Sequence, residues 1–90
     1  MAVTISITPS NAKLGDTVTV TYESTGFQTT TIQMDNMANP LTFSGDVSGS
    51  FKTLPIMNGT FTAVLTATGR AIYDSSDGAA IIVSDTCDIA

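Results

Sequence analysis

A strict alternation of polar and apolar residues fills the stretch Thr17-Val18-Thr19-Val20-Thr21-Tyr22-Glu23. Side chains on a β-strand point alternately to opposite faces, so the two valines and the tyrosine share one face. Threonine, valine and tyrosine also suit a pleated, half-buried surface. The stretch therefore predicts a strand with one face in a hydrophobic core.

The same period of two recurs in two other stretches of the chain. Residues 3–8 alternate in the same way, and residues 60–68 place four apolar side chains on one face. Val64 interrupts the polar face of 60–68, which predicts a central strand there. The apolar residues of the two predicted strands are Val3, Ile5 and Ile7, and Phe61, Ala63, Leu65 and Ala67.

Weaker strand patterns fill the rest of the sequence. They cover residues 29–35, 41–43, 47–54 and 79–84, and turn-forming residues separate them. The segment Val47–Lys52 contains Ser-Gly-Ser, which predicts an edge strand. In the turn over residues 9–16 we expect Leu14 to be a buried anchor. No segment keeps a helical period, so about seven short strands predict an antiparallel sandwich or barrel.

The composition limits the partners of this single domain of 90 residues. Only 12% of the residues are charged, and the formal net charge is −5. The three cations, Lys13, Lys52 and Arg70, are not clustered, which argues against binding to nucleic acid or to an anionic membrane. The N-terminus lacks the basic and apolar regions of a signal peptide, and no apolar run is long enough to span a membrane.

The residue types also argue against an enzyme. The chain has no histidine and a single cysteine, Cys87, which excludes an internal disulfide and a zinc site of histidines and cysteines. Most of the eight acidic residues fall in predicted turns, where Asp bonds local backbone. Asp74, Asp77 and Asp85, with Ser75 and Ser76, offer oxygen ligands for calcium, but their spacing matches no EF-hand. We expect a solvated loop there, and neither a catalytic site, a cofactor nor a metal.

Three stretches carry a family resemblance. The first is Ile5–Pro9 followed by Gly15–Tyr22, the second is Leu54–Pro55 with Gly59–Thr62 and Thr66–Gly69, and the third is Ala80–Asp85. Together they resemble the first two strands, a corner with its following strand, and the last strand of bacterial and phage immunoglobulin-like domains. The chain departs from antibody-type domains because it lacks the cysteine pair and the tryptophan. The resemblance implies an immunoglobulin-like sandwich of about seven strands over residues 1–85, followed by a C-terminal tail at 86–90.

Domains of this type are frequent among the decoration, or cement, proteins of tailed phages. The resemblance therefore implies a non-enzymatic structural protein on the virion surface, made in the host cytoplasm and bound through loops, edge strands and termini. The implied partner is the major capsid protein or another virion protein, with self-association on the capsid as a further expectation. Since fold does not fix function, these remain expectations.

Apolar residues in the predicted loops are the candidates for partner binding. They centre on the loops at 36–40 and 55–59, where methionine suits an adaptable contact surface. An alternative is that these loop tips merely cover the ends of the sandwich. A second alternative is a carbohydrate- or cell-surface-binding module of a larger bacterial protein, with Phe27 and Tyr73 as its aromatic platform. The full set of candidates is Phe27, Met37, Pro40, Met57, Ile72 and Tyr73.

Overall fold

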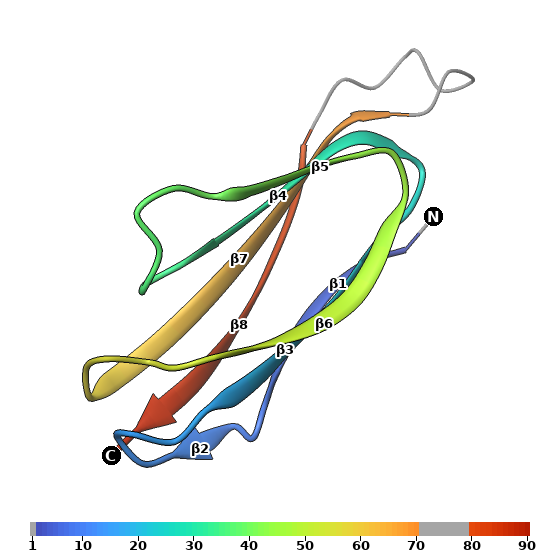
Figure 1. The fold of residues 1–90 in the computed structure, drawn as a ribbon. Coiled ribbons are helices and arrows are strands. Elements are labelled where there is room, and N and C mark those ends of the chain that lie inside the picture. Colours follow the sequence, from blue (N-terminus) through green and yellow to red (C-terminus); the bar gives the residue numbers. More distant parts are fainter. Residues whose placement is uncertain (1, 71–79) are drawn as a thin grey trace.

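The computed structural model describes residues 2–70 and 80–90, and in them the chain folds into two β-sheets packed face to face (Figure 1). The all-β prediction is confirmed, although the described residues form eight strands where about seven were expected. The described residues include no helix that could cross a membrane. The strands are β1 (Val3–Thr8), β2 (Asn11–Ala12), β3 (Val18–Ser24), β4 (Phe27–Met34), β5 (Leu41–Ser44), β6 (Val47–Thr53), β7 (Gly59–Arg70) and β8 (Ile81–Ile89).

One sheet has three strands in the order β1-β3-β6, and the other has five in the order β2-β8-β7-β4-β5. All neighbours pair antiparallel except β2, which runs parallel to β8. The predicted edge strand Val47–Lys52 lies in β6, at the edge of the smaller sheet. The predicted central strand 60–68 lies in β7, between β8 and β4. Both of these predictions are confirmed.

The core consists of the alternating inward side chains of both sheets. The alternation predicted for β1, β3 and β7 is confirmed, because the apolar residues of each lie in or against the core. Burial of these apolar side chains, without any disulfide, is the main force that holds the two sheets together. The buried apolar residues are Ile5, Ile7, Val18, Val20, Phe27, Ile32, Met34, Phe61, Ala63, Leu65, Ala67, Cys87 and Ile89.

The C-terminal segment belongs to the sandwich, so the predicted tail at 86–90 was wrong. Strand β8 continues to Ile89, and both Cys87 and Ile89 are buried in the core. β2 pairs with the end of β8, and the Ala90 N–H donates to the Ala12 carbonyl at 2.9 Å. The short strand β2 that the sequence did not predict is therefore the partner that holds the C-terminus in place.

The prediction of Leu14 as a buried anchor was also wrong, because its side chain is 53% exposed. The backbone anchors this loop instead. The Leu14 N–H donates to the Ala90 carbonyl at 3.0 Å, and the Asp16 N–H donates to the Lys13 carbonyl at 2.9 Å. The loop therefore presents an apolar side chain to solvent.

A pair of buried hydroxyl groups and a cluster of aromatic rings add to the packing of the sandwich. The Thr30 hydroxyl of β4 donates to the Ser24 hydroxyl of β3 at 2.7 Å, and both residues are fully buried. Where the edges of β5 and β6 approach each other, the Tyr22 ring stacks on Phe43 at 5.5 Å and is tilted against Phe51 at 5.9 Å. The Thr30–Ser24 and Tyr22–Phe43 contacts join the two sheets in addition to the aliphatic core, whereas the Tyr22–Phe51 contact lies within the smaller sheet.

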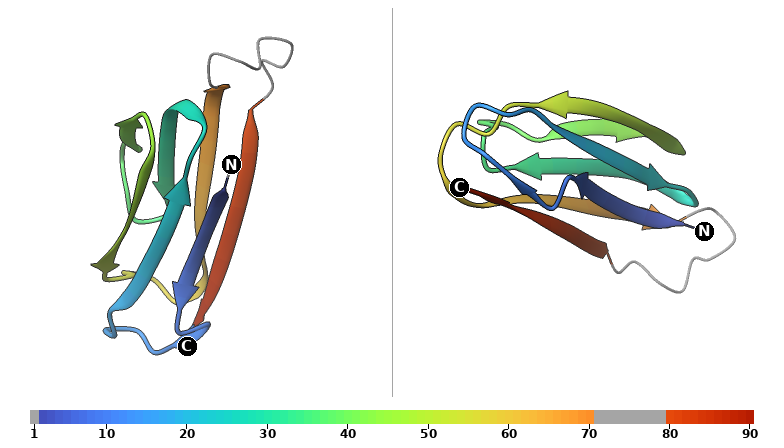
Figure 2. Two further views of the ribbon diagram at one scale, coloured as in Figure 1. Left: turned by 90° about the vertical axis from the view of Figure 1, so that its right-hand side faces the viewer. Right: turned by 90° about the horizontal axis from the view of Figure 1, so that it is seen from below.

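The molecule is elongated, with extents of 45, 19 and 16 Å along its principal axes. The N-terminus and the connections β3–β4 and β5–β6 lie at one end (Figures 1 and 2). The C-terminus lies at the other end, together with the loops at residues 13–17, 35–40 and 54–58. We call this second end the loop end.

Candidate functional site

The candidate site lies at the loop end, where the β4–β5 and β6–β7 loops meet. The first loop joins two strands of the larger sheet, the second connects the smaller sheet to the larger one, and the side chain of Asn36 links them. Its Nδ2 donates to Thr53 Oγ1 at 2.7 Å and to the Leu54 carbonyl at 3.2 Å. The loops are therefore held in a fixed relation to each other before any partner arrives.

Asp35 ties the β4–β5 loop to β7. Its Oδ2 accepts a hydrogen bond from the Thr62 N–H at 3.0 Å, and its own N–H donates to the Thr62 carbonyl at 3.3 Å. Gln33 adds a local constraint, since its Nε2 donates to the carbonyls of Met34 and Met37 at 3.1 and 2.9 Å. These bonds preorganise the turn that follows β4.

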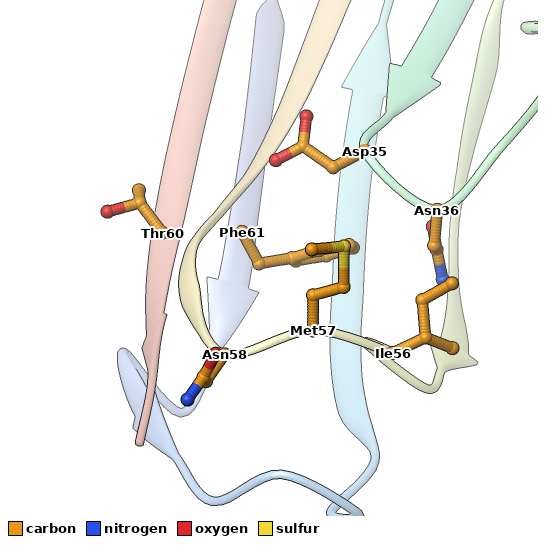
Figure 3. Close-up of a pocket in the computed structure, with 7 residues that line it drawn as sticks. All are labelled: Asp35, Asn36, Ile56, Met57, Asn58, Thr60 and Phe61. Atoms are coloured by element: carbon orange, nitrogen blue, oxygen red, sulfur yellow. The ribbon is translucent and has the colours of Figure 1, made fainter.

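A hollow of about 390 Å³ lies between the two loops (Figure 3). In the close-up, Asp35 lies above the Phe61 ring and the Met57 side chain, with Asn36 and Ile56 together on the other side. The lining therefore mixes apolar side chains with side chains that carry oxygen atoms. The lining residues are Asp35, Asn36, Ile56, Met57, Asn58, Thr60 and Phe61.

Large apolar side chains are exposed in the loops around this hollow. Ile56 and Met57 are 71% and 73% exposed, and Leu54 is 46% exposed. Leu14 of the β2–β3 loop lies at the same end, because Val18 at the start of β3 pairs with Thr53 at the end of β6. Such a gathering of apolar side chains is typical of a contact surface.

Three of the predicted candidates lie at the loop end. Met57 and Pro40 are exposed, and Met37 is half-buried against the core. Phe27 as a surface candidate was wrong, because it is 3% exposed. Strand β4 begins at Phe27, two residues earlier than predicted, which makes this residue part of the core.

The last two candidates, Ile72 and Tyr73, lie outside the described residues. Leu54 and Ile56, which are exposed beside the hollow, were not among the predicted candidates. Both flank Pro55, which is buried. Two large apolar residues on either side of a turn-forming proline are the local sequence signal that could have identified them.

The acidic side chains form backbone hydrogen bonds. Asp16 accepts from the Lys13 N–H in its own loop at 3.2 Å, whereas Asp35 accepts from β7 and Asp46 accepts from the Gly26 N–H at 2.9 Å. Asp85 accepts from the Ile7 N–H at 2.7 Å. Of the calcium candidates only Asp85 is described, and no group of three potential metal ligands occurs within residues 2–70 and 80–90.

Cys87 lies in the core rather than in a tail. Burial raises the pKa of its thiol, and the negative charges of Asp88 and Asp85 raise it further. The thiol is therefore protonated at neutral pH, in the form that is a poor nucleophile. This position suits a packing role.

Comparisons with known proteins identify no relative: no family model, no curated protein and no solved structure matches the chain.

Proposed function

We propose that this chain is an immunoglobulin-like structural protein of a virus particle, without enzymatic activity, that decorates or cements a phage capsid. The proposal rests on the surface of the loop end. There, apolar side chains stand exposed on loops that hydrogen bonds already hold in place. Such a surface is suited to binding another protein with little loss of loop entropy.

The strand order supports the immunoglobulin-like part of the proposal. In that fold the strands A, B and E share one sheet and the strands C, F and G share the other. The order β1-β3-β6 corresponds to A-B-E, and β8-β7-β4 corresponds to G-F-C with β5 added beside C, as in variable-type domains. The resemblance of the sequence to phage domains of this type then supports the virion setting.

The exposed edge of β6 supplies a second contact in this proposal. β6 pairs only with β3 among the described strands and carries one charged residue, Lys52. An edge strand offers backbone donors and acceptors to an added strand. On a capsid this edge would serve self-association between neighbouring copies.

The glycan-binding alternative has less support from the structure. It requires an exposed aromatic platform, and Phe27, one of its two candidate residues, is buried in the core. The other, Tyr73, lies outside the described residues. We therefore favour a protein partner.

Co-sedimentation with phage capsids tests the proposal. Capsids of the phage that encodes the chain, prepared without it, are mixed with the wild-type protein and with the variants Ile56→Asp and Ile82→Asp. The two isoleucines are matched, since they are 71% and 64% exposed, and Ile82 lies in β8 away from the loop end. We expect the wild type and Ile82→Asp to bind stoichiometrically, and Ile56→Asp to lose binding.

Two results would contradict the proposal. Absence of the wild-type protein from the capsid pellet at any concentration would contradict the capsid partner, and binding of the wild type to a glycan array would then favour the alternative. Equal loss of binding in the two variants would contradict the loop end as the contact surface.

A further inference from the structure

The hollow at the loop end has hydrogen-bond acceptors that the chain itself leaves unused. Asn36 Oδ1 is buried, and no group among the described residues donates a hydrogen bond to it. Its orientation is fixed, because Nδ2 of the same amide donates to Thr53 and Leu54. An unpaired buried acceptor is costly, which marks this position as one where a donor from outside would be stabilising.

Asp35 supplies a second acceptor. Its Oδ2 is used by the Thr62 N–H, whereas within residues 2–70 and 80–90 no hydrogen bond reaches Oδ1. No ion pair is formed by this carboxylate in the described part of the chain, and no Lys or Arg lines the hollow. The hollow therefore combines one negative charge with an amide oxygen and lacks a positive charge.

The other walls are apolar and one of them can move. The Phe61 ring is almost fully buried, and Ile56 and Met57 are largely exposed. The unbranched Met57 side chain has three rotatable bonds and can adapt its shape to an incoming group. Long aliphatic stems with a polar head fit such a mixed surface, since lysine and arginine lay their methylenes on apolar groups and keep the charge among polar ones.

We propose that this hollow is a binding site for a cationic side chain, lysine or arginine, of the partner protein. The methylenes lie against Met57 and Ile56, and the ammonium or guanidinium group donates to Asp35 Oδ1 and Asn36 Oδ1. The identity of the partner as a protein rests on the proposed function. The negative net charge of the chain, −5, favours the approach of such a cationic surface.

Other ligand classes fit the hollow less well. A calcium ion takes six to eight oxygen ligands, and the lining offers a single carboxylate. An anion would be repelled by the negative charge of Asp35. A purely apolar group would leave Asn36 Oδ1 without a donor. A cationic side chain is the class that uses both the charge and the apolar walls.

NMR titration tests the site on the isolated protein. The probes are the Nα-acetyl methylamides of lysine, arginine and norleucine, and norleucine reproduces the aliphatic stem without the charge. We expect lysine, arginine or both to shift the Asn36 side-chain amide and the Thr62 N–H signals, and norleucine to bind about fivefold more weakly. Whether lysine or arginine binds more tightly identifies which residue the partner contributes.

The variant Asp35→Asn removes the charge and keeps an oxygen for the Thr62 N–H. Asp46→Asn is the matched control, because Asp46 also accepts a backbone hydrogen bond but lies at the other end of the sandwich. We expect about fivefold weaker lysine or arginine binding in Asp35→Asn only.

Equal binding of norleucine and the cationic probes to the wild type would overturn the inference, whether or not the variants fold. Equal weakening in Asp35→Asn and Asp46→Asn, or no shifts with any probe, would also overturn it. Capsids are absent from this titration, so its outcome is separate from that of co-sedimentation. Capsid binding without any response to the cationic probes would leave the proposed function standing and remove this site.

Discussion

The carboxylate of Asp85 accepts a hydrogen bond from the Ile7 N–H at 2.7 Å, across the boundary between the two sheets. Asp85 belongs to β8 in the larger sheet, and Ile7 belongs to β1 in the smaller one. β1 pairs with β3 along one side only, so this carboxylate takes the place of a strand partner on the other side. The bond explains why an acidic residue is tolerated at an inward position of β8.

Replacement of Asp85 by Ala is expected to lower the free energy of unfolding by about 1–3 kcal/mol, because the Ile7 amide loses its acceptor in a partly buried place. Urea denaturation measures the change. Asp88→Ala is the matched control, since it removes the same charge from an exposed position of the same strand and should change stability by less than about 0.5 kcal/mol. Equal effects of the two variants would show that charge, rather than the hydrogen bond, is responsible.

The buried pair of Ser24 and Thr30 is expected to be coupled in stability. Thr30→Val leaves the Ser24 hydroxyl buried without a partner, which should cost about 1–3 kcal/mol. The double variant Ser24→Ala with Thr30→Val removes both polar groups and should cost less than the sum of the single changes. A double-mutant cycle in chemical denaturation measures the coupling, and strictly additive effects would contradict it.

Gly59 is expected to resist substitution for a backbone reason. Its φ is +114°, and an added Cβ would meet no atom within 4 Å, so the cost of Gly59→Ala arises from the backbone alone. A residue with a side chain is strained at such a positive φ, so Gly59→Ala should lower the free energy of unfolding by about 1–2 kcal/mol. Thermal unfolding measures this, with Asn58→Ala, an exposed neighbour, as the control. A neutral Gly59→Ala would mean that the loop adopts another conformation.

The Cys87 thiol is expected to be unreactive in the folded protein. Burial raises its pKa, and the charges of Asp88 and Asp85 raise it further, so little thiolate forms at pH 8. Reaction with a disulfide reagent such as Ellman's reagent should be negligible in native buffer and complete in denaturant. Rapid labelling of the native protein would contradict the core position of this residue.

The same pKa shift sets a pH dependence. A thiol with a raised pKa holds its proton more tightly in the folded state than in the unfolded state. Its contribution to stability is therefore complete below the pKa of the unfolded thiol and decreases as the pH rises from there through the pKa of the folded thiol. Wild type should lose more stability than Cys87→Ala between neutral and alkaline pH, and parallel pH profiles of the two proteins would contradict this.

Much of the sandwich could be predicted because strand burial has a period of two. The alternation at 17–23 and at 60–68 identified the inward residues of β3 and β7. The same rule failed in β8, where Val83, Cys87 and Ile89 alternate inward but Asp85 interrupts them. Only the tertiary hydrogen bond to Ile7 makes an acid acceptable there, and a sequence does not show that bond.

The site could be predicted in part for a similar reason. The positions of Met37, Pro40 and Met57 in loops followed from the strand pattern, and strands of alternating direction bring those loops to one end. The hollow itself depends on contacts between residues far apart in the sequence, such as Asn36 with Leu54. Phe27 was misplaced because the connection between β3 and β4 is only two residues long, shorter than the predicted gap.

The narrow cross-section of the sandwich limits how tightly one copy can hold a partner. The two short dimensions of the sandwich, 19 and 16 Å between Cα atoms, bound an end-on contact. Their product is roughly 300 Å², below the roughly 800 Å² that each partner buries in a standard interface. A single copy should therefore bind and dissociate readily. Firm attachment would require several linked copies acting together, and each would stand about 45 Å tall with the β3–β4 and β5–β6 connections at its far end.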